Sequence, residues 1–113
     1  MLKIDRRTLG KFQFIAVVGE VDMLVSPEVR DALQNAFQDS PEGVVVDLSG
    51  VPFMDSSGIA TLVEGMQWSR RESAHFILVG VQEKVMNSLK LARMNELLEI
   101  YPTAQEALQS LSP

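Results

Sequence analysis

The sequence predicts a single α/β domain over residues 1–113, with a mixed, mostly parallel sheet of about five strands and about four helices. Two short runs dominated by β-branched and other apolar residues, at 44–48 and 76–79, are typical of strands buried on both faces of a sheet. Apolar residues recur every three to four positions between such runs, which indicates amphipathic helices. The expected order is β-β-α-β-α-β-α-β-α, and short connections between alternating elements imply parallel strands with right-handed crossovers.

The first part of the chain predicts a hairpin followed by a helix. Residues 2–8 and 12–18 are expected to be strands, and Gly-Lys at 10–11 favours a tight antiparallel turn between them. Residues 26–28, Ser-Pro-Glu, predict a helix start with Ser26 as N-cap and Pro27 in the first helical position. Residues 40–43, Ser-Pro-Glu-Gly, end this helix. Its apolar face is expected to comprise Val29, Ala32, Leu33, Ala36 and Phe37.

The middle of the chain predicts two buried strands separated by a helix. The strand at 44–48 is followed by a helix expected over residues 58–70. The second strand, 76–79, ends at Gly80. The apolar face of the helix between them is expected to comprise Ile59, Leu62, Val63 and Met66.

The last part of the chain predicts a helix, a short strand and a closing helix. Residues 82–92 have helical periodicity, and residues 97–101 fit a strand that Pro102 ends. Thr103 followed by Glu106 matches a capping box at the start of the closing helix. The core-facing residues of that helix are expected to be Ala104, Ala107, Leu108 and Leu111.

Composition narrows the classes of function. The chain is 46% hydrophobic and 22% charged, which is typical of a folded domain. Its net charge of −5 argues against nucleic acid and anionic membranes as partners, since both require a basic surface. The absence of cysteine excludes disulfides, thiolate zinc sites and cysteine nucleophiles. With neither a signal peptide nor an apolar run of about 20 residues, the chain is expected to be cytoplasmic and not inserted in a membrane.

Two adjacent serines follow the buried strand at 44–48 and precede the next helix. The start of a helix has unpaired N–H groups and a partial positive charge. One interpretation is structural, with Asp55 or Ser56 accepting hydrogen bonds from the first turn as an N-cap. The other is functional: Ser56 accepts a phosphate that switches the binding of a partner without unfolding the domain. The residues alone favour capping, and the two roles are compatible.

Catalytic and metal sites are weakly indicated. Glu20, Asp22, Asp47 and Asp55 would meet at one end of the sheet as a magnesium site or paired carboxylates, but solvated loop acids are the favoured interpretation. His75 is the single histidine, and no nucleophile–base pair is apparent. We therefore expect no metal, no cofactor and no enzymatic activity.

Residues 47–60, with the sequence DLSGVPFMDSSGIA, resemble the signature of STAS domains, and specifically of bacterial anti-sigma factor antagonists. Three other segments agree with this resemblance. Residues 19–22 (GEVD) resemble the motif after the family's second strand, and residues 76–81 (FILVGV) resemble the strand before its third helix. Residues 100–108 (IYPTAQEAL) resemble its closing strand and helix. The likeness extends over essentially the whole chain.

The resemblance implies a phosphorylation-switched regulator. The unphosphorylated protein would bind an anti-sigma factor that is also a serine protein kinase, and this binding would release a sigma factor. The kinase would then phosphorylate Ser56 and the complex would dissociate, until a serine phosphatase resets it. The partner surface implied by the resemblance comprises Glu20, Asp22, Asp55, Ser57, Gly58 and Ile59.

An alternative within the same family is a structural subunit. Such a STAS domain docks constitutively on an ATPase of a lipid-transport or other transporter complex, and its serines need not be modified. Co-purification with an ATP-binding transporter subunit would favour this alternative.

Overall fold

A mixed five-stranded sheet organises residues 2–111, the part of the chain that the computed structural model describes. The strands are β1 (Lys3–Leu9), β2 (Phe12–Val18), β3 (Gly43–Gly50), β4 (His75–Val79) and β5 (Glu99–Tyr101). The helices are α1 (Ser26–Gln38), α2 (Ser56–Arg71), α3 (Glu83–Leu91) and α4 (Ala104–Leu111). The strands lie in chain order, β1 antiparallel to β2 and the others parallel to their neighbours. The predicted element order and mixed sheet are confirmed.

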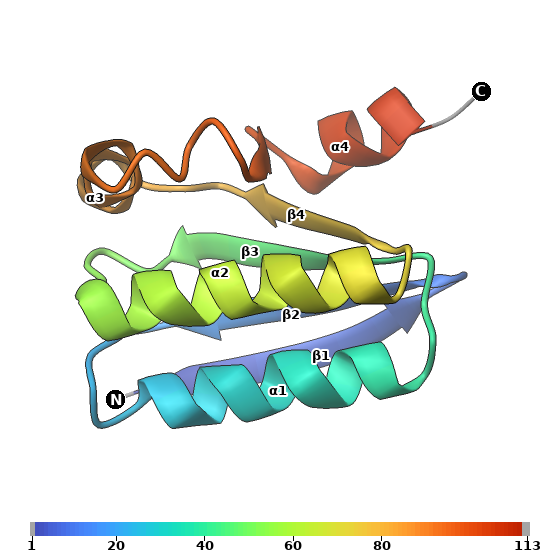
Figure 1. The fold of residues 1–113 in the computed structure, drawn as a ribbon, viewed down its shortest axis with the longest axis horizontal. Helices are drawn as coiled ribbons and strands as arrows, with labels where there is room; N and C mark the ends of the chain where they lie inside the picture. Colours follow the sequence, from blue (N-terminus) through green and yellow to red (C-terminus); the bar gives the residue numbers. More distant parts are fainter. Residues whose placement is uncertain (1, 112–113) are drawn as a thin grey trace.

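β3 lies in the middle of the sheet and is buried on both faces. Val44 and Val46 pack into the main core, which includes buried residues of α1 and α2. Val45 faces the other way and packs with Ala107 of α4. All three valines are 0% exposed, since side chains alternate between two covered faces. Figure 1 shows α1 and α2 running together in front of the sheet.

The parallel pairing brings two loops together at one end of the sheet. β2 and β3 both run toward the left in Figure 1, so the β2–α1 and β3–α2 loops leave the sheet at the same end. Backbone bonds then join the loops: Val21 N–H donates to the carbonyl of Phe53, and Asp55 N–H donates to the carbonyl of Val21, both at 3.0 Å. Val21 and Met54 form an isolated parallel bridge. This pairing fixes the position of the residues that start α2.

The N-cap predicted at Ser26 is wrong. Ser26 lies inside the first turn of α1 and is 7% exposed, while Val25 occupies the cap position without a side-chain cap bond. Asp22 supplies the missing acceptors instead. Its carboxylate accepts from the N–H groups of Leu24 (2.9 Å) and Val25 (3.2 Å), and its carbonyl accepts from Ser26 N–H (2.8 Å). A turn closed by Asp22 therefore precedes the helix in place of the predicted serine cap.

The strand predicted over residues 97–101 is shorter in the structure. β5 begins at Glu99, because the N–H groups of Leu97 and Leu98 both donate to the carbonyl of Met94 and close a turn. Leu98 is buried in the core, whereas Leu97 is 52% exposed. The apolar pair therefore belongs to the turn that follows α3.

Gly65 allows α2 to approach β4 closely. A Cβ atom built on Gly65 would lie 2.6 Å from the ring of Phe76, a separation too short for carbon atoms. Phe76 is itself buried and also contacts the ring of Phe37.

α2 has 16 residues, and no helix among residues 2–111 is long and apolar enough to cross a membrane.

We expect Gly65→Ala to lower the free energy of unfolding by about 1–2 kcal/mol. Overpacking a core costs about 1–3 kcal/mol, and the better helix propensity of alanine returns up to about 1 kcal/mol. Urea unfolding measures the difference. Ala60→Gly, at an exposed position of the same helix, measures the propensity effect alone. A Gly65→Ala protein more stable than wild type would contradict this account.

Candidate functional site

Ser56 is the first residue of α2 and lies exposed at the end of the sheet where the two loops meet. Its hydroxyl makes no hydrogen bond within residues 2–111. The helix begins two residues earlier than the expected 58–70, so Ser56 stands directly at the N-terminus. A group attached to its Oγ would enter solvent next to the partial positive charge of the helix start.

Asp55 caps α2. Its Oδ1 accepts from Ser57 N–H at 2.9 Å and from Gly58 N–H at 3.4 Å, while its backbone is extended. Met23 N–H, from the β2–α1 loop, also interacts with this carboxylate. Of the two caps that the sequence left open, the structure selects Asp55 over Ser56. Asp55 therefore closes the helix with its carboxylate and joins the neighbouring loop through its own N–H, which donates to Val21.

Ser57 differs from Ser56 in its environment, although the two are adjacent. Ser57 is half-buried, and its hydroxyl donates to Asp55 Oδ1 at 2.6 Å. A hydrogen bond to a carboxylate is among the stronger hydrogen bonds in proteins. Ser57 is thus held by the cap, whereas the Ser56 hydroxyl is available.

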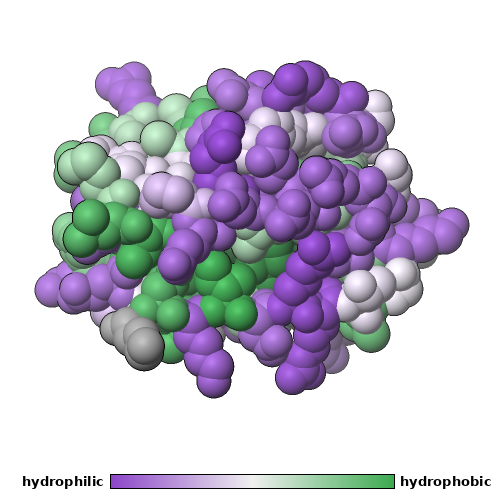
Figure 2. Space-filling model, turned by 90° about the horizontal axis from the view of Figure 1, so that it is seen from below, coloured by the Kyte–Doolittle hydropathy of each residue, from purple (hydrophilic) through white to green (hydrophobic). Residues whose placement is uncertain are grey.

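The β2–α1 loop places Glu20 and Asp22 on the surface beside this site. Asp22 is exposed, but its carboxylate is occupied by the turn before α1. The most exposed apolar side chains of the loop are Met23 (74%) and Leu24 (88%), which sequence analysis did not single out. In the view from below, hydrophobic residues gather toward the left half of the molecule, and this loop lies at its left end (Figure 2). In the sequence, two consecutive apolar residues in a loop were the signal that could have pointed to Met23 and Leu24.

Gly58 and Ile59 have different positions. Gly58 is buried, because the first turn of α2 rests on Met54 and Val21; a Cβ at Gly58 would overlap the Met54 side chain and lie 3.0 Å from Val21 Cγ1. Ile59 is half-buried and reaches the surface between α2 and α3. Gly58 therefore shapes the helix start, while Ile59 remains accessible.

The other acidic and histidine candidates have structural contacts. Asp47 accepts from Ser49 N–H at 2.9 Å and holds the loop after β3. His75 begins β4, and its Nδ1 lies 3.4 Å from a carboxylate oxygen of Glu99. Within residues 2–111, no group of three or more His, Cys, Asp or Glu residues is arranged to hold a metal ion.

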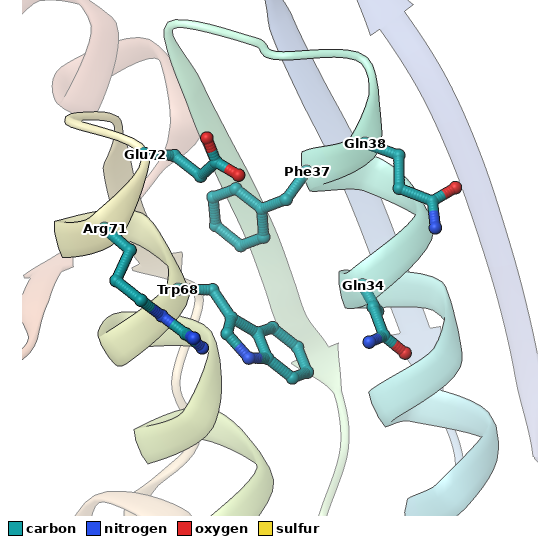
Figure 3. A pocket seen from close by; sticks show the side chains of 6 residues that line it. All are labelled: Gln34, Phe37, Gln38, Trp68, Arg71 and Glu72. Atoms are coloured by element: carbon teal, nitrogen blue, oxygen red, sulfur yellow. The ribbon is translucent and has the colours of Figure 1, made fainter.

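Trp68 lies near the opposite end of α2 from Ser56, about 18 Å along the helix at 1.5 Å per residue. Its ring meets that of Phe37 edge-on, with centroids 6.4 Å apart, and the guanidinium of Arg30 lies 5.4 Å above it. The two rings line a pocket of about 300 Å³, and Figure 3 shows them between the ends of α1 and α2. This half-buried tryptophan joins the two helices and is separate from the serine site.

The pKa of Asp55 is lowered from its ordinary value. The largest cause is the hydrogen bond from the Ser57 hydroxyl, and the N–H groups of Ser57, Gly58 and Met23 add to it. These donors favour the ionised carboxylate, which partial burial opposes.

We expect the contribution of Asp55 to stability to be lost in acid. Because its pKa is lower in the folded chain, this contribution is complete above the unfolded pKa of about 4 and declines as pH falls through the folded pKa. Asp55→Asn should therefore unfold at lower urea than wild type at neutral pH, and the difference should shrink below about pH 4. Asp31→Asn, at an exposed position of α1, controls for net charge. A difference that persists unchanged into strong acid would contradict this assignment.

Known proteins share this sequence pattern and fold. The STAS domain family matches residues 3–107. A protein from Staphylococcus aureus named anti-sigma-B factor antagonist is 25% identical over 99 residues, covering 88% of this chain and 92% of that protein. Its namesake from Listeria monocytogenes is 30% identical over 88 residues, covering 76% of this chain and 75% of that protein.

A solved structure agrees with these relatives. The crystal structure of an anti-sigma factor antagonist from Mycobacterium paratuberculosis has a TM-score of 0.88 and 25% identity, covering 97% of this chain and 93% of that one. The family match includes every strand and the DSSG element at the start of α2. The chain therefore belongs to the STAS domain family.

Proposed function

We propose that this STAS domain is an anti-sigma factor antagonist acting in the cytoplasm as a phosphorylation switch. In its unphosphorylated form it binds an anti-sigma factor that is also a serine protein kinase, and this binding frees a sigma factor. Phosphorylation of Ser56 ends the complex, and a serine phosphatase restores the starting form. The protein is a substrate and ligand in this cycle rather than an enzyme, and it needs no cofactor. The names of the Staphylococcus and Listeria relatives support the proposal.

The observation that carries the proposal is the contrast between the two serines. A kinase must bring the γ-phosphate of ATP in line with a hydroxyl oxygen and accept the hydroxyl proton on its own base. Ser56 offers an exposed hydroxyl with no hydrogen bond inside residues 2–111. Ser57 would have to give up its 2.6 Å bond to Asp55 first. The phosphoryl group therefore goes to Ser56 Oγ as ADP leaves.

A phosphate at this position suits the fold. The partial positive charge at the start of α2 favours an anion, and the exposed Ser56 side chain displaces no core residue when modified. The added charge of roughly −1.5 to −2 acts instead on whatever packs over the serine. Phosphorylation in this position changes binding and leaves the domain folded.

The partner-facing residues follow from this arrangement. Glu20, Asp22 and Ile59 would contact the kinase directly, since their side chains reach the surface near Ser56. Asp55, Ser57 and Gly58 would act by shaping the loop that presents Ser56, because Asp55 caps the helix and Gly58 packs beneath it.

We expect Ser56→Ala to abolish phosphorylation and Ser57→Ala to retain it. The test uses the protein kinase that immobilised wild-type chain retains from its cell of origin, purified and supplied with labelled ATP. Mass spectrometry then maps the modified residue. Equal labelling of the Ser56→Ala and wild-type proteins would refute the acceptor assignment. Recovery of an ATP-binding transporter subunit, with neither serine modified, would favour the constitutive alternative.

We expect Ser56→Asp to weaken kinase binding while changing the free energy of unfolding by less than about 0.5 kcal/mol, as is usual for an exposed position. The negative charge imitates part of the phosphate at a helix start that tolerates it. Titration calorimetry and urea unfolding measure the two effects, and Ser56→Asn provides a neutral control. A large loss of stability would instead indicate that Ser56 is needed for capping.

A further inference from the structure

β1 is an edge strand whose outer side pairs with no other strand within residues 2–111. It lies at one end of the sheet and pairs with β2 alone, over its whole length of seven residues. Six of these residues are exposed, and only Ile4 is half-buried. A long edge without proline or a bulge is a template for pairing with another strand.

The backbone groups that face this open edge follow from the hairpin. Gly10, with φ +60°, is the first of two turn residues, so the flanking residues Leu9 and Phe12 form a hydrogen-bonded pair. Hydrogen-bonded and open pairs then alternate along the two antiparallel strands. The N–H and C=O groups that point away from the sheet are therefore those of Ile4, Arg6 and Thr8.

Two antiparallel β1 strands have complementary charges in the register that pairs the whole strand. In a symmetric pair, the residues that face the edge must lie opposite one another. A two-fold axis through Arg6 satisfies this condition over residues 3–9 and places Asp5 opposite Arg7 of the second copy, and Arg7 opposite Asp5. An axis through Asp5 or through Arg7 would instead place identical charges opposite each other, which is destabilising.

We propose that β1 pairs with β1 of a second copy of this chain, which joins two five-stranded sheets edge to edge in a symmetric dimer. The pairing would form about six backbone hydrogen bonds, two for each opposed pair of edge-facing residues. Charge complementarity identifies the occupant. Arg7 Nε lies 3.5 Å from Asp5 Oδ2 within one copy, and both side chains are largely exposed. The two copies together would form a ring of four alternating charges.

Arg6 lies on the proposed two-fold axis, and its charge is already compensated. Its Nη2 donates to Asp39 Oδ2 at 2.7 Å, and its Nε donates to Gln13 Oε1 at 2.8 Å. Asp39 follows the last residue of α1, so this bond draws the guanidinium toward the helix. Each copy therefore brings a paired arginine to the axis rather than a bare charge.

The outer pairs would cover apolar surface. Leu9 is 62% exposed and would lie opposite Lys3, whose aliphatic stem can pack over it. Ile4 would lie opposite Thr8, and both are β-branched residues that favour strands.

The dimer leaves the serine site accessible. No residue of β1 belongs to the surface proposed around Ser56, and antiparallel pairing directs the two Ser56 sites toward opposite ends of the joined sheet. The inference therefore does not rest on the proposed function.

The test measures self-association of the full chain by analytical ultracentrifugation and exchange of its amide hydrogens by NMR. Asp5→Arg places arginine opposite Arg7 of the second copy. The double variant Asp5→Arg, Arg7→Asp restores complementary charges in exchanged positions. Glu96→Arg makes the same change in net charge as Asp5→Arg, at an exposed position between α3 and β5.

We expect the wild-type chain to dimerise reversibly and Asp5→Arg to raise the dimer Kd about tenfold, because two attractive cross-strand pairs become repulsive. The double variant and Glu96→Arg should both dimerise like wild type. As the wild-type concentration rises, amide exchange should slow at residues 4, 6 and 8, which gain hydrogen bonds across the edge. Exchange at residues 5 and 7, which already bond to β2, should not change.

A wild-type chain that stays monomeric at about 1 mM would overturn the proposal. A dimer with the same Kd in Asp5→Arg, or one that slows amides other than those of residues 4, 6 and 8, would also overturn it. Urea unfolding checks that each variant is folded. If Asp5→Arg fails to fold, the double variant decides: its dimerisation supports the proposal, and its failure to dimerise when folded refutes it.

Discussion

Burial of β3 on both faces is the constraint on which the rest of this structure depends. A strand whose valines are fully buried on alternating sides must have helices over both faces of the sheet. Helices on the faces require crossover connections, and crossovers make the neighbouring strands parallel. Parallel strands in turn place the β2–α1 and β3–α2 loops at one end, where backbone bonds between Val21, Phe53 and Asp55 join them. The position of Ser56 follows from this chain of requirements.

Asp55 gives the two adjacent serines at this end of the sheet different environments. Its carboxylate closes the first turn of α2 and takes the Ser57 hydroxyl, so the adjacent hydroxyl of Ser56 is left available. The N–H of the same residue donates to the carbonyl of Val21 and so joins the neighbouring loop. Capping and modification are thus complementary: the cap holds the helix start in place, and the exposed serine can change charge without disturbing it.

The errors of sequence analysis have a common physical origin. Ser26 fits the local statistics of a helix cap, yet the distant pairing of Val21 with the β3–α2 loop lets Asp22 form the turn before α1 and leaves Ser26 buried. Residues 97 and 98 have the composition of a strand, yet both donate to Met94 and complete a turn after α3. In each case backbone N–H groups donate to an acceptor up to four residues earlier in the chain, Asp22 or Met94, and not to the partner that the pattern favoured. A local pattern is compatible with several such acceptors and does not decide between them.

The sequence by itself determined the order of elements, the buried central strand and the location of the DSSG element at a helix start, because hydrophobic periodicity and turn chemistry are local properties. Only the tertiary structure decided which residue caps α2, which serine is held and which is available, and that Ile59, Leu91 and Met94 line one groove with Ser56. The cap bonds themselves are short in sequence, since Asp55 accepts from residues two and three positions ahead, but the groove depends on contacts between segments far apart in the chain. No local pattern encodes such contacts, since they form only when the parallel sheet brings the loops and helices to the same end.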